Sequence, residues 1–271
     1  MTRVLVTGGA GLLGRTMVPR LAQAGYTVRV MSRRLRREGE LPEAEWAQAD
    51  LETGAGLREA VAEVDTIVHA ASKPTPTAAK KVDVEGTARL LEAGRAAGAS
   101  HLLYISIVGI ERFPSFPYYR AKLKAEEEIR AGGIPWTILR ATQFHQFLDA
   151  LLRPAMRLLV ALLPTDFRFQ TIDAGEVAAR MVELVAAGPS GQVPDIGGPE
   201  VLTLSEMVRA WQEARGLRRR VLRLPVPGST AAGFRRGANT CPEQRYGAIT
   251  WQSWLQETYV SGRAAASAYS R

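Results

Sequence analysis

Gly8, Gly11 and Gly14 recur every three residues near the start of the chain, directly after the predicted strand 3–7 and before a helical pattern. In such a unit the first glycine makes the tight turn and the second lets the backbone approach a pyrophosphate. The third lets helix and strand pack closely, and the helix N-terminus then binds the phosphates. This loop therefore predicts a dinucleotide site. Its expected contacts are Gly8, Gly11, Leu12, Leu13 and Gly14.

The end of the second predicted strand, 26–32, indicates which dinucleotide fits. A site for NAD carries Asp or Glu there, to hold the ribose 2′-hydroxyl. This chain has Ser32, Arg33 and Arg34 instead, with no acid. A hydroxyl and two guanidiniums suit a 2′-phosphate, which adds negative charge and accepts paired hydrogen bonds. We therefore expect NADP(H) to be favoured over NAD(H); the alternative is a solvated arginine-rich loop.

Tyr118 and Lys122 are four residues apart in a predicted helix, so their side chains share one helix face. Ser106 ends the predicted strand before them. With the glycine loop, this order of motifs resembles the short-chain dehydrogenase/reductase superfamily, and more narrowly its atypical, NmrA-like branch. The segments Tyr104-Ile-Ser-Ile-Val-Gly and Tyr118-Tyr-Arg-Ala-Lys are similar to that branch. The resemblance covers residues 1 to about 145 and is weaker beyond.

The resemblance implies a site for hydride transfer from a nicotinamide to a carbonyl. Lys122 would hold the nicotinamide ribose and favour the deprotonated form of Tyr118. Ser106 would hydrogen-bond the substrate carbonyl, and Tyr118 would protonate the forming alkoxide. Ser115 is an alternative for the serine role. These implications make Ser106, Tyr118 and Lys122 the expected catalytic residues.

The same resemblance implies further cofactor contacts at the ends of three other predicted strands. One pair would border the adenine, a run of small residues would lie beside the adenosine ribose, and one polar residue would lie near the nicotinamide. In that order, these are Asp50 and Leu51; Ala70, Ala71 and Ser72; and Thr142. His69, next to the small residues, fits a histidine in the core at a strand end better than a ligand.

Asp83 marks a departure from the pattern of the superfamily. Extended members often carry Asn in an N-x-x-G-T segment, where it helps to organise a water in the proton relay. Here the segment reads Asp83-Val-Glu-Gly-Thr. An acid in place of the amide puts that relay in question, whereas cofactor binding does not depend on it.

Strands alternating with helices are needed to position these residues. The strands are expected at 3–7, 26–32, 45–50, 66–71, 101–106 and 135–140, and the helices between them at 11–24, 82–97 and 118–131. This alternation predicts an α/β fold, a Rossmann-type doubly wound parallel sheet over residues 1–145. Residues 146–271 are expected to form a smaller C-terminal substrate lobe packed on it, which is not an independent domain. Within that lobe, residues 144–163 have a largely helical pattern that Pro154 must bend or restart.

The composition fits a globular protein, with 46% hydrophobic and 23% charged residues. A single cysteine, Cys241, excludes an internal disulfide framework and a cysteine-based zinc site, and we expect no metal. The net charge of +8 comes without a nucleic-acid-binding motif, so we expect no nucleic-acid partner. The longest apolar stretch, Leu158 to Leu163, is too short to span a bilayer, and nothing resembles a signal peptide. A cytoplasmic protein is expected.

Apolar residues after the sixth predicted strand, including Phe147, Leu148, Leu151 and Leu152, fit either a substrate pocket or an ordinary core. The leading hypothesis is an NADPH-dependent oxidoreductase that reduces an apolar carbonyl or a quinone-like small molecule. The competing hypothesis is a non-catalytic NADP(H)-binding sensor that acts through a protein partner. A third is a structural accessory that holds a nucleotide.

Overall fold

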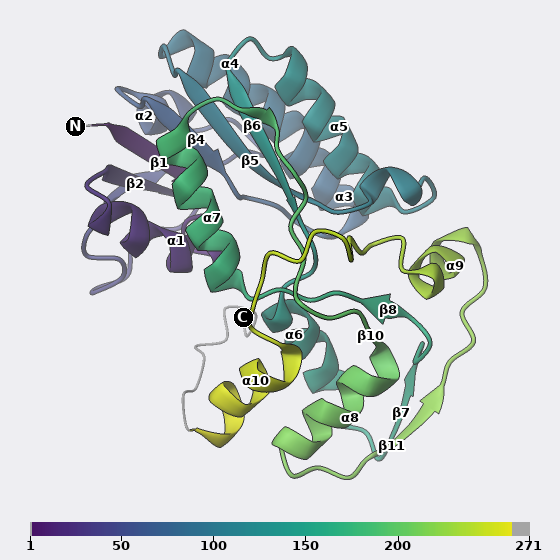
Figure 1. Cartoon of the computed structure of the whole chain (residues 1–271). Coiled ribbons are helices and arrows are strands. Elements are labelled where there is room, and N and C mark those ends of the chain that lie inside the picture. The colour runs from purple at the N-terminus through teal and green to yellow at the C-terminus, as the bar shows by residue number, and fades with distance from the viewer. Residues whose placement is uncertain (1, 262–271) are drawn as a thin grey trace. The chain divides into compact units, whose positions relative to one another are not determined.

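Short strands rich in Val, Leu and Ile alternate with helices in the first half of the chain. In the computed structural model, which describes residues 2–261, they form a seven-stranded parallel sheet of order β3-β2-β1-β4-β5-β6-β9 (Figure 1). The strands are β1 Arg3–Thr7, β2 Thr27–Ser32, β3 Glu45–Gln48, β4 Thr66–His69, β5 His101–Ile107, β6 Trp136–Ala141 and β9 Gly191–Gln192. The order reverses between β1 and β4, which confirms the predicted Rossmann-type doubly wound sheet.

Helices cover both faces of this sheet. They are α1 Leu12–Gln23, α2 Leu57–Val61, α3 Pro76–Ala79, a π-helical turn Lys80–Glu85, α4 Gly86–Ala96, α5 Pro117–Ala131 and α7 Ala174–Ala187. In Figure 1, α7 lies over one face, whereas α4 and α5 lie over the other. On that second face Leu5, Ile67 and Leu102 pack with Leu90 of α4 and Ile129 of α5. All five side chains are fully buried, so the sheet is apolar on the face that these helices cover.

Contacts group the chain into two units. Unit 1 comprises the residues up to 106, 117–140 and 177–194; unit 2 comprises 107–116, 141–176 and the residues from 195 onward. This grouping differs from a single boundary after residue 145 because β9, from late in the chain, hydrogen-bonds to β6 and so belongs to the sheet. That residues 146–271 are not an independent domain stays a prediction.

Unit 2 is built from short helices and two small sheets. Its elements are α6 His145–Ala155, β7 Val160–Leu163, β8 Arg168–Phe169, β10 Leu202–Thr203, α8 Leu204–Ala214, β11 Arg220–Arg223, α9 Ser229–Arg236, α10 Trp251–Leu255 and a π-helical turn Gln256–Val260. β7 pairs with β11 in parallel, and β8 pairs with β10 in antiparallel orientation. Leu148, Trp211 and Trp251 lie in its core. Thr203 caps α8 through a capping box with Glu206.

The largely helical pattern expected through residue 163 is wrong for its last part. α6 ends at Ala155, and residues 160–163 form the strand β7. Pro154 lacks an N–H and so weakens the last turn of α6, while the apolar run after it pairs with β11, about 60 residues later in the chain. A pairing over this distance leaves no periodic signal near residue 160.

A hydrogen-bonded chain of side chains connects the sheet to α4. His69 is fully buried between the Thr7 hydroxyl, 2.7 Å from its Nδ1, and the Thr87 hydroxyl, 2.9 Å from its Nε2. Thr7 Oγ1 also accepts from the N–H groups of Ala70 and Ala71, and the Thr87 hydroxyl donates to the carbonyl of Asp83. Each hydroxyl has one proton, so Thr7 donates to Nδ1 and the ring donates from Nε2 to Thr87.

This arrangement requires a neutral ring. Burial, together with the positive charge of Lys122, lowers the pKa of His69 to about 3. His69 is therefore neutral at ordinary pH and acts as a structural link.

No helix within residues 2–261 is long and apolar enough to cross a membrane. The same residues contain no group of three or more His, Cys, Asp or Glu side chains placed to hold a metal ion.

Replacement of Thr87 by Val should destabilise the protein by about 1–3 kcal/mol, because the buried Nε2–H of His69 loses its acceptor while the side-chain volume is kept. Thr87→Ser retains the hydroxyl and is the matched control. Denaturant unfolding at neutral pH measures both. Equal free energies of unfolding for the Val and Ser variants would contradict the role given to this chain.

Candidate functional site

The glycine loop lies where the strand order reverses, at the carboxyl ends of β1 and β4. Gly8 has φ +67°, and a Cβ there would lie 2.9 Å from the Cα of Ala71. A Cβ on Gly14 would lie 2.4 Å from the Cα of Gly9, so both positions exclude larger residues. Gly11 caps α1 without a side-chain hydrogen bond, which leaves the first N–H groups of α1 for a ligand. These features fit a dinucleotide pyrophosphate.

The residues at the end of β2 differ in whether their side chains already interact with the protein or are exposed to a 2′-phosphate. Arg34 donates to the carboxylate of Glu40, and its guanidinium stacks over the Trp46 ring at 5.5 Å. The hydrogen bond from Arg34 is the main reason that the pKa of Glu40 lies below its ordinary value. Ser32 accepts from the backbone N–H of Arg34. Arg34 thus holds the loop in place, whereas Arg33 is exposed.

An acid from another strand lies next to Arg33. Glu52, which follows β3, is 3.9 Å from the Arg33 guanidinium and accepts a 2.6 Å hydrogen bond from Lys73. These partners, Lys73 foremost, lower the pKa of Glu52. The prediction from the end of β2 did not include this carboxylate. Glu52 directly follows Asp50 and Leu51, the pair expected to border the adenine.

The other expected cofactor contacts occupy turns in the two units. Asp50 accepts from the N–H of Glu52 in the turn after β3, and Leu51 is buried. Ala70 and Ala71 donate their N–H groups to Thr7, as described above. Thr142 belongs to unit 2, where its N–H donates to the carbonyl of Ile196. Their contacts with a cofactor stay predictions.

Tyr118 lies at the end of a hydrogen-bonded chain that reaches a buried carboxylate. Its hydroxyl is 2.9 Å from the hydroxyl of Ser72, and Ser72 donates to Asp83 Oδ1 at 2.6 Å. Since Ser72 has a single proton, Tyr118 is the donor in the first bond when Asp83 is ionised. Ser72 is exposed and Tyr118 half-buried, whereas Asp83 is fully buried. The chain therefore leads from solvent into the protein.

Asp83 is held by the π-helical turn between α3 and α4, a type of irregularity that is frequent at functional sites. Burial raises its pKa above the ordinary value, while Lys122, Ser72 and the N–H of Lys73 act in the opposite direction. A carboxyl with a raised pKa can exchange a proton closer to neutral pH. The acid at the position of the usual Asn is thus part of the hydrogen-bonded chain to Tyr118.

Lys122 is buried one helical turn after Tyr118. Its ammonium donates to the carbonyl of Ile105 at 2.9 Å, lies 4.2 Å from the centre of the Tyr104 ring and is 3.9 Å from Asp83 Oδ1. Burial lowers the pKa of Lys122, and the nearby carboxylates counteract this. The structure therefore groups Tyr118, Lys122 and Asp83 in unit 1.

Ser106 lies on the strand β5 and interacts with a later turn of α5 than the one that carries Tyr118. Its side chain is buried. Burial alone would raise the pKa of Glu126, but hydrogen bonds lower it, foremost the one from Arg140, and the Ser106 hydroxyl contributes. Glu126 follows Lys122 by one turn, so it lies two turns from Tyr118 along α5. The hydroxyl that contacts Tyr118 is that of Ser72. Ser115, the alternative, accepts from Ser229 within unit 2.

The apolar residues of α6 divide between core and surface. Leu148 and Leu152 are buried in the core of unit 2, whereas Phe147 is 36% and Leu151 51% exposed. The two exposed side chains share one face of α6 because they are four residues apart. They are the members of this group that remain available to an apolar ligand.

Comparison with known proteins identifies the type of nucleotide site. The model of a family described as NAD(P)H-binding matches residues 8–187. This segment contains the glycine loop, Ser72, Asp83, Tyr118 and Lys122. The match confirms the expected dinucleotide site and does not distinguish NAD from NADP.

Relatives with different roles share this sequence pattern. The chain is 30% identical over 238 residues to (4-alkanoyl-5-oxo-2,5-dihydrofuran-3-yl)methyl phosphate reductase of Streptomyces griseus subsp. griseus, covering 84% of this chain and 78% of the relative. It is 25% identical over 232 residues to the photosystem II assembly factor Ycf39 of Trieres chinensis, covering 82% and 72%. An NADPH-dependent quinone oxidoreductase of Escherichia coli, solved with NADPH, has the same fold, with a TM-score of 0.77 at 17% identity over 94% of this chain and 99% of that one.

Arg33→Ala should weaken NADPH binding about tenfold and leave NADH binding unchanged, because only the 2′-phosphate needs the guanidinium. Glu52→Gln should leave NADPH binding as tight or tighter, since it removes a carboxylate that competes for Arg33. Fluorescence titration with both cofactors measures these affinities, and Arg37→Ala on the same exposed loop is the control. Equal affinities of the parent protein for NADPH and NADH would refute the expected preference.

Proposed function

Because the chain belongs to the NAD(P)H-binding family, we propose that it is an NADPH-dependent oxidoreductase that reduces an apolar carbonyl or a quinone-like small molecule. The observation that carries this proposal is the chain Tyr118–Ser72–Asp83 beside Lys122. A protein that only held a nucleotide would not need a buried carboxyl linked through hydroxyls to a phenol. Such an arrangement is suited to moving a proton.

The residues of the site divide the work of a reduction. Bound NADPH supplies the hydride. Its expected contacts are the glycine loop together with Ser32, Arg33, Arg34, Asp50, Leu51, Ala70, Ala71, Ser72, Tyr118, Lys122 and Thr142. Tyr118 donates its proton to the substrate oxygen as negative charge develops there. Ser72 then returns a proton to the phenolate oxygen and receives one from the Asp83 carboxyl.

Two further groups complete this scheme. Lys122 is held by Ile105 and Asp83, so its positive charge stays near the phenolate form of Tyr118. Water at the exposed Ser72 restores the proton of Asp83 between turnovers. Ser106 hydrogen-bonds the substrate carbonyl in this scheme, and its hydroxyl also helps to lower the pKa of Glu126.

The apolar character of the substrate is supported by two observations. Phe147 and Leu151 place exposed apolar surface on α6, which begins directly after the strand that precedes Thr142 and the predicted nicotinamide end. The E. coli structure is of a quinone oxidoreductase, whereas the Streptomyces relative is named as a reductase of an alkanoyl-bearing methyl phosphate. A cytoplasmic location and the absence of a nucleic-acid partner stay predictions.

A second candidate function is a non-catalytic NADP(H)-binding protein that acts through a protein partner. The similarity to an assembly factor over 82% of this chain favours it. The two candidates differ in turnover. Tight NADPH binding without oxidation of NADPH by any carbonyl or quinone in a broad panel would support the second and contradict the first.

Tyr118→Phe should lower turnover by about 10²–10⁴-fold, because it removes the proton donor, while NADPH affinity is retained. Ser72→Ala should lower turnover about tenfold through loss of one hydrogen bond in the chain, and Ser106→Ala should lower it less. NADPH oxidation under saturating substrate measures all three. Tyr119→Phe, at the next position, is the control. Unchanged turnover in Tyr118→Phe would refute the proton-donor role.

The pH dependence of turnover should report Asp83. Its raised pKa means that the protonated carboxyl persists to higher pH than in an ordinary Asp, and turnover in the reductive direction falls as pH rises through that pKa. Asp83→Asn cannot supply a proton, so its turnover is lower and this limb of the profile is absent. The measurement is kcat between pH ~5 and ~9. An identical profile for parent and Asp83→Asn would contradict the relay.

A further inference from the structure

The small sheet formed by β7 and β11 in unit 2 has apolar side chains on both faces, and Arg220 lies beside Val160 on the outer face. On the inner face, Ala161 is buried and Val221 packs against the same core. On the outer face, Val160 is 41%, Leu162 58% and Leu222 47% exposed. Parallel sheets in proteins are normally covered on both faces. We therefore expect another surface to bind this outer face, which residues 2–261 leave exposed.

Two more leucines extend this surface. Leu158 and Leu159 precede β7 and are 62% and 77% exposed, which is unusual for neighbouring leucines. We call Leu158, Leu159, Val160, Leu162 and Leu222 together the leucine face. The first two lie in the connection between α6 and β7.

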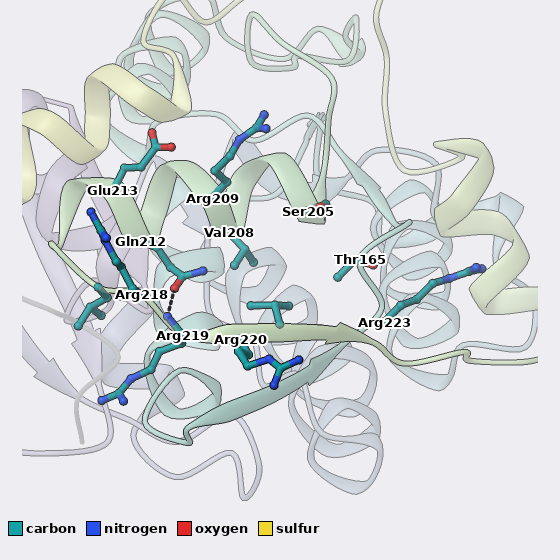
Figure 2. A pocket seen from close by; sticks show the side chains of 12 residues that line it. Thr165, Ser205, Val208, Arg209, Gln212, Glu213, Arg218, Arg219, Arg220 and Arg223 are labelled. Atoms are coloured by element: carbon teal, nitrogen blue, oxygen red, sulfur yellow. Dashed lines mark hydrogen bonds between the residues drawn. The ribbon is translucent and has the colours of Figure 1, made fainter.

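A cluster of positive charge adjoins the leucine face. Because β7 and β11 are parallel and Arg220 pairs with Val160, Arg218 and Arg219 lie at the same end of the sheet as Leu158 and Leu159. Figure 2 shows these arginines at a groove of about 640 Å³ between α8 and β11. The guanidiniums of Arg218–Arg220 form no ion pair with residues 2–261. At the other end of β11, Arg223 pairs with Asp166. Glu213 is the acidic residue that lines the groove.

We propose that the leucine face and Arg218–Arg220 form a docking surface for an anionic lipid bilayer. The exposed leucines enter the boundary between headgroups and acyl chains, and the guanidiniums bind the phosphates of the headgroups. Exposed apolar side chains next to unpaired positive charges suit such an interface. This inference does not depend on the proposed reductase activity.

The same features argue against other occupants. In a symmetric dimer through this face, each copy would bring its own unpaired arginines to the contact, and like charges would oppose association. An acidic protein would match the charge alone. A bilayer matches both the unpaired arginines and the five neighbouring exposed apolar side chains.

Sedimentation of the full chain with vesicles tests the proposal. Binding is expected to phosphatidylcholine vesicles that contain phosphatidylglycerol, and much less to phosphatidylcholine alone. Leu158→Ser/Leu159→Ser and Arg218→Glu/Arg219→Glu should each weaken binding at least about tenfold. Leu35→Ser is the control for loss of an exposed leucine, as Leu35 is 71% exposed in unit 1. Arg36→Glu/Arg37→Glu is the control for the same change in net charge.

Several outcomes would overturn the proposal. These are no binding to either vesicle, binding that the two controls reduce as much as the two test variants, and binding that added salt leaves unchanged. Analytical ultracentrifugation without lipid covers the remaining case. A concentration-dependent dimer that Leu162→Ser disperses would assign the leucine face to self-association instead.

Discussion

The buried hydrogen-bonded chain Thr7–His69–Thr87 is the constraint on which the candidate site depends. It ties the end of β1, from which the glycine loop starts, to the end of β4, which leads to Ser72, and to α4, which follows Asp83. Buried side chains thus fix to one another the three segments that are expected to carry the nucleotide loop and the proton path. An unpaired donor here costs about 1–3 kcal/mol, a large part of a typical stability of ~5–15 kcal/mol.

Asp83 and Lys122 are a second, costlier feature of this interior. At 3.9 Å their attraction is about 4 kcal/mol for an effective dielectric constant of ~20. Burial costs each ion several kcal/mol, so the pair gains little or nothing in stability over apolar residues. Burial raises the pKa of Asp83 and lowers the pKa of Lys122, so it favours the neutral form of each group. A pair that stability does not explain, linked by a hydroxyl to a phenol, is better explained by chemistry.

The sequence was most informative where function depends on residues close together in the chain. The glycine loop and the pair Tyr118 and Lys122 follow from spacings of three to four residues, and the parallel sheet follows from the alternation of strands and helices. The partner of Tyr118 could not be predicted in this way, because Ser72 is 46 residues away and reaches it only through the fold. Strand alternation places Ser106 on the same face of β5 as Tyr104, whose ring contacts Lys122. The position of Glu52 next to Arg33 and the strand β7 could not be predicted for the same reason. Both depend on contacts between segments that are far apart in the chain.

The charged groups near the expected 2′-phosphate are exposed to solvent, whereas those near Tyr118 are buried. Arg33, Glu52 and Lys73 lie near solvent, so their balance is screened by salt and any cofactor preference that they create weakens as ionic strength rises. Asp83 and Lys122 are buried, and their interaction is far less screened. Proton transfer along Ser72 should therefore be insensitive to conditions that alter cofactor choice. In the proposed function, recognition of the nucleotide's charge is therefore assigned to groups near solvent, and storage of the proton is assigned to buried groups.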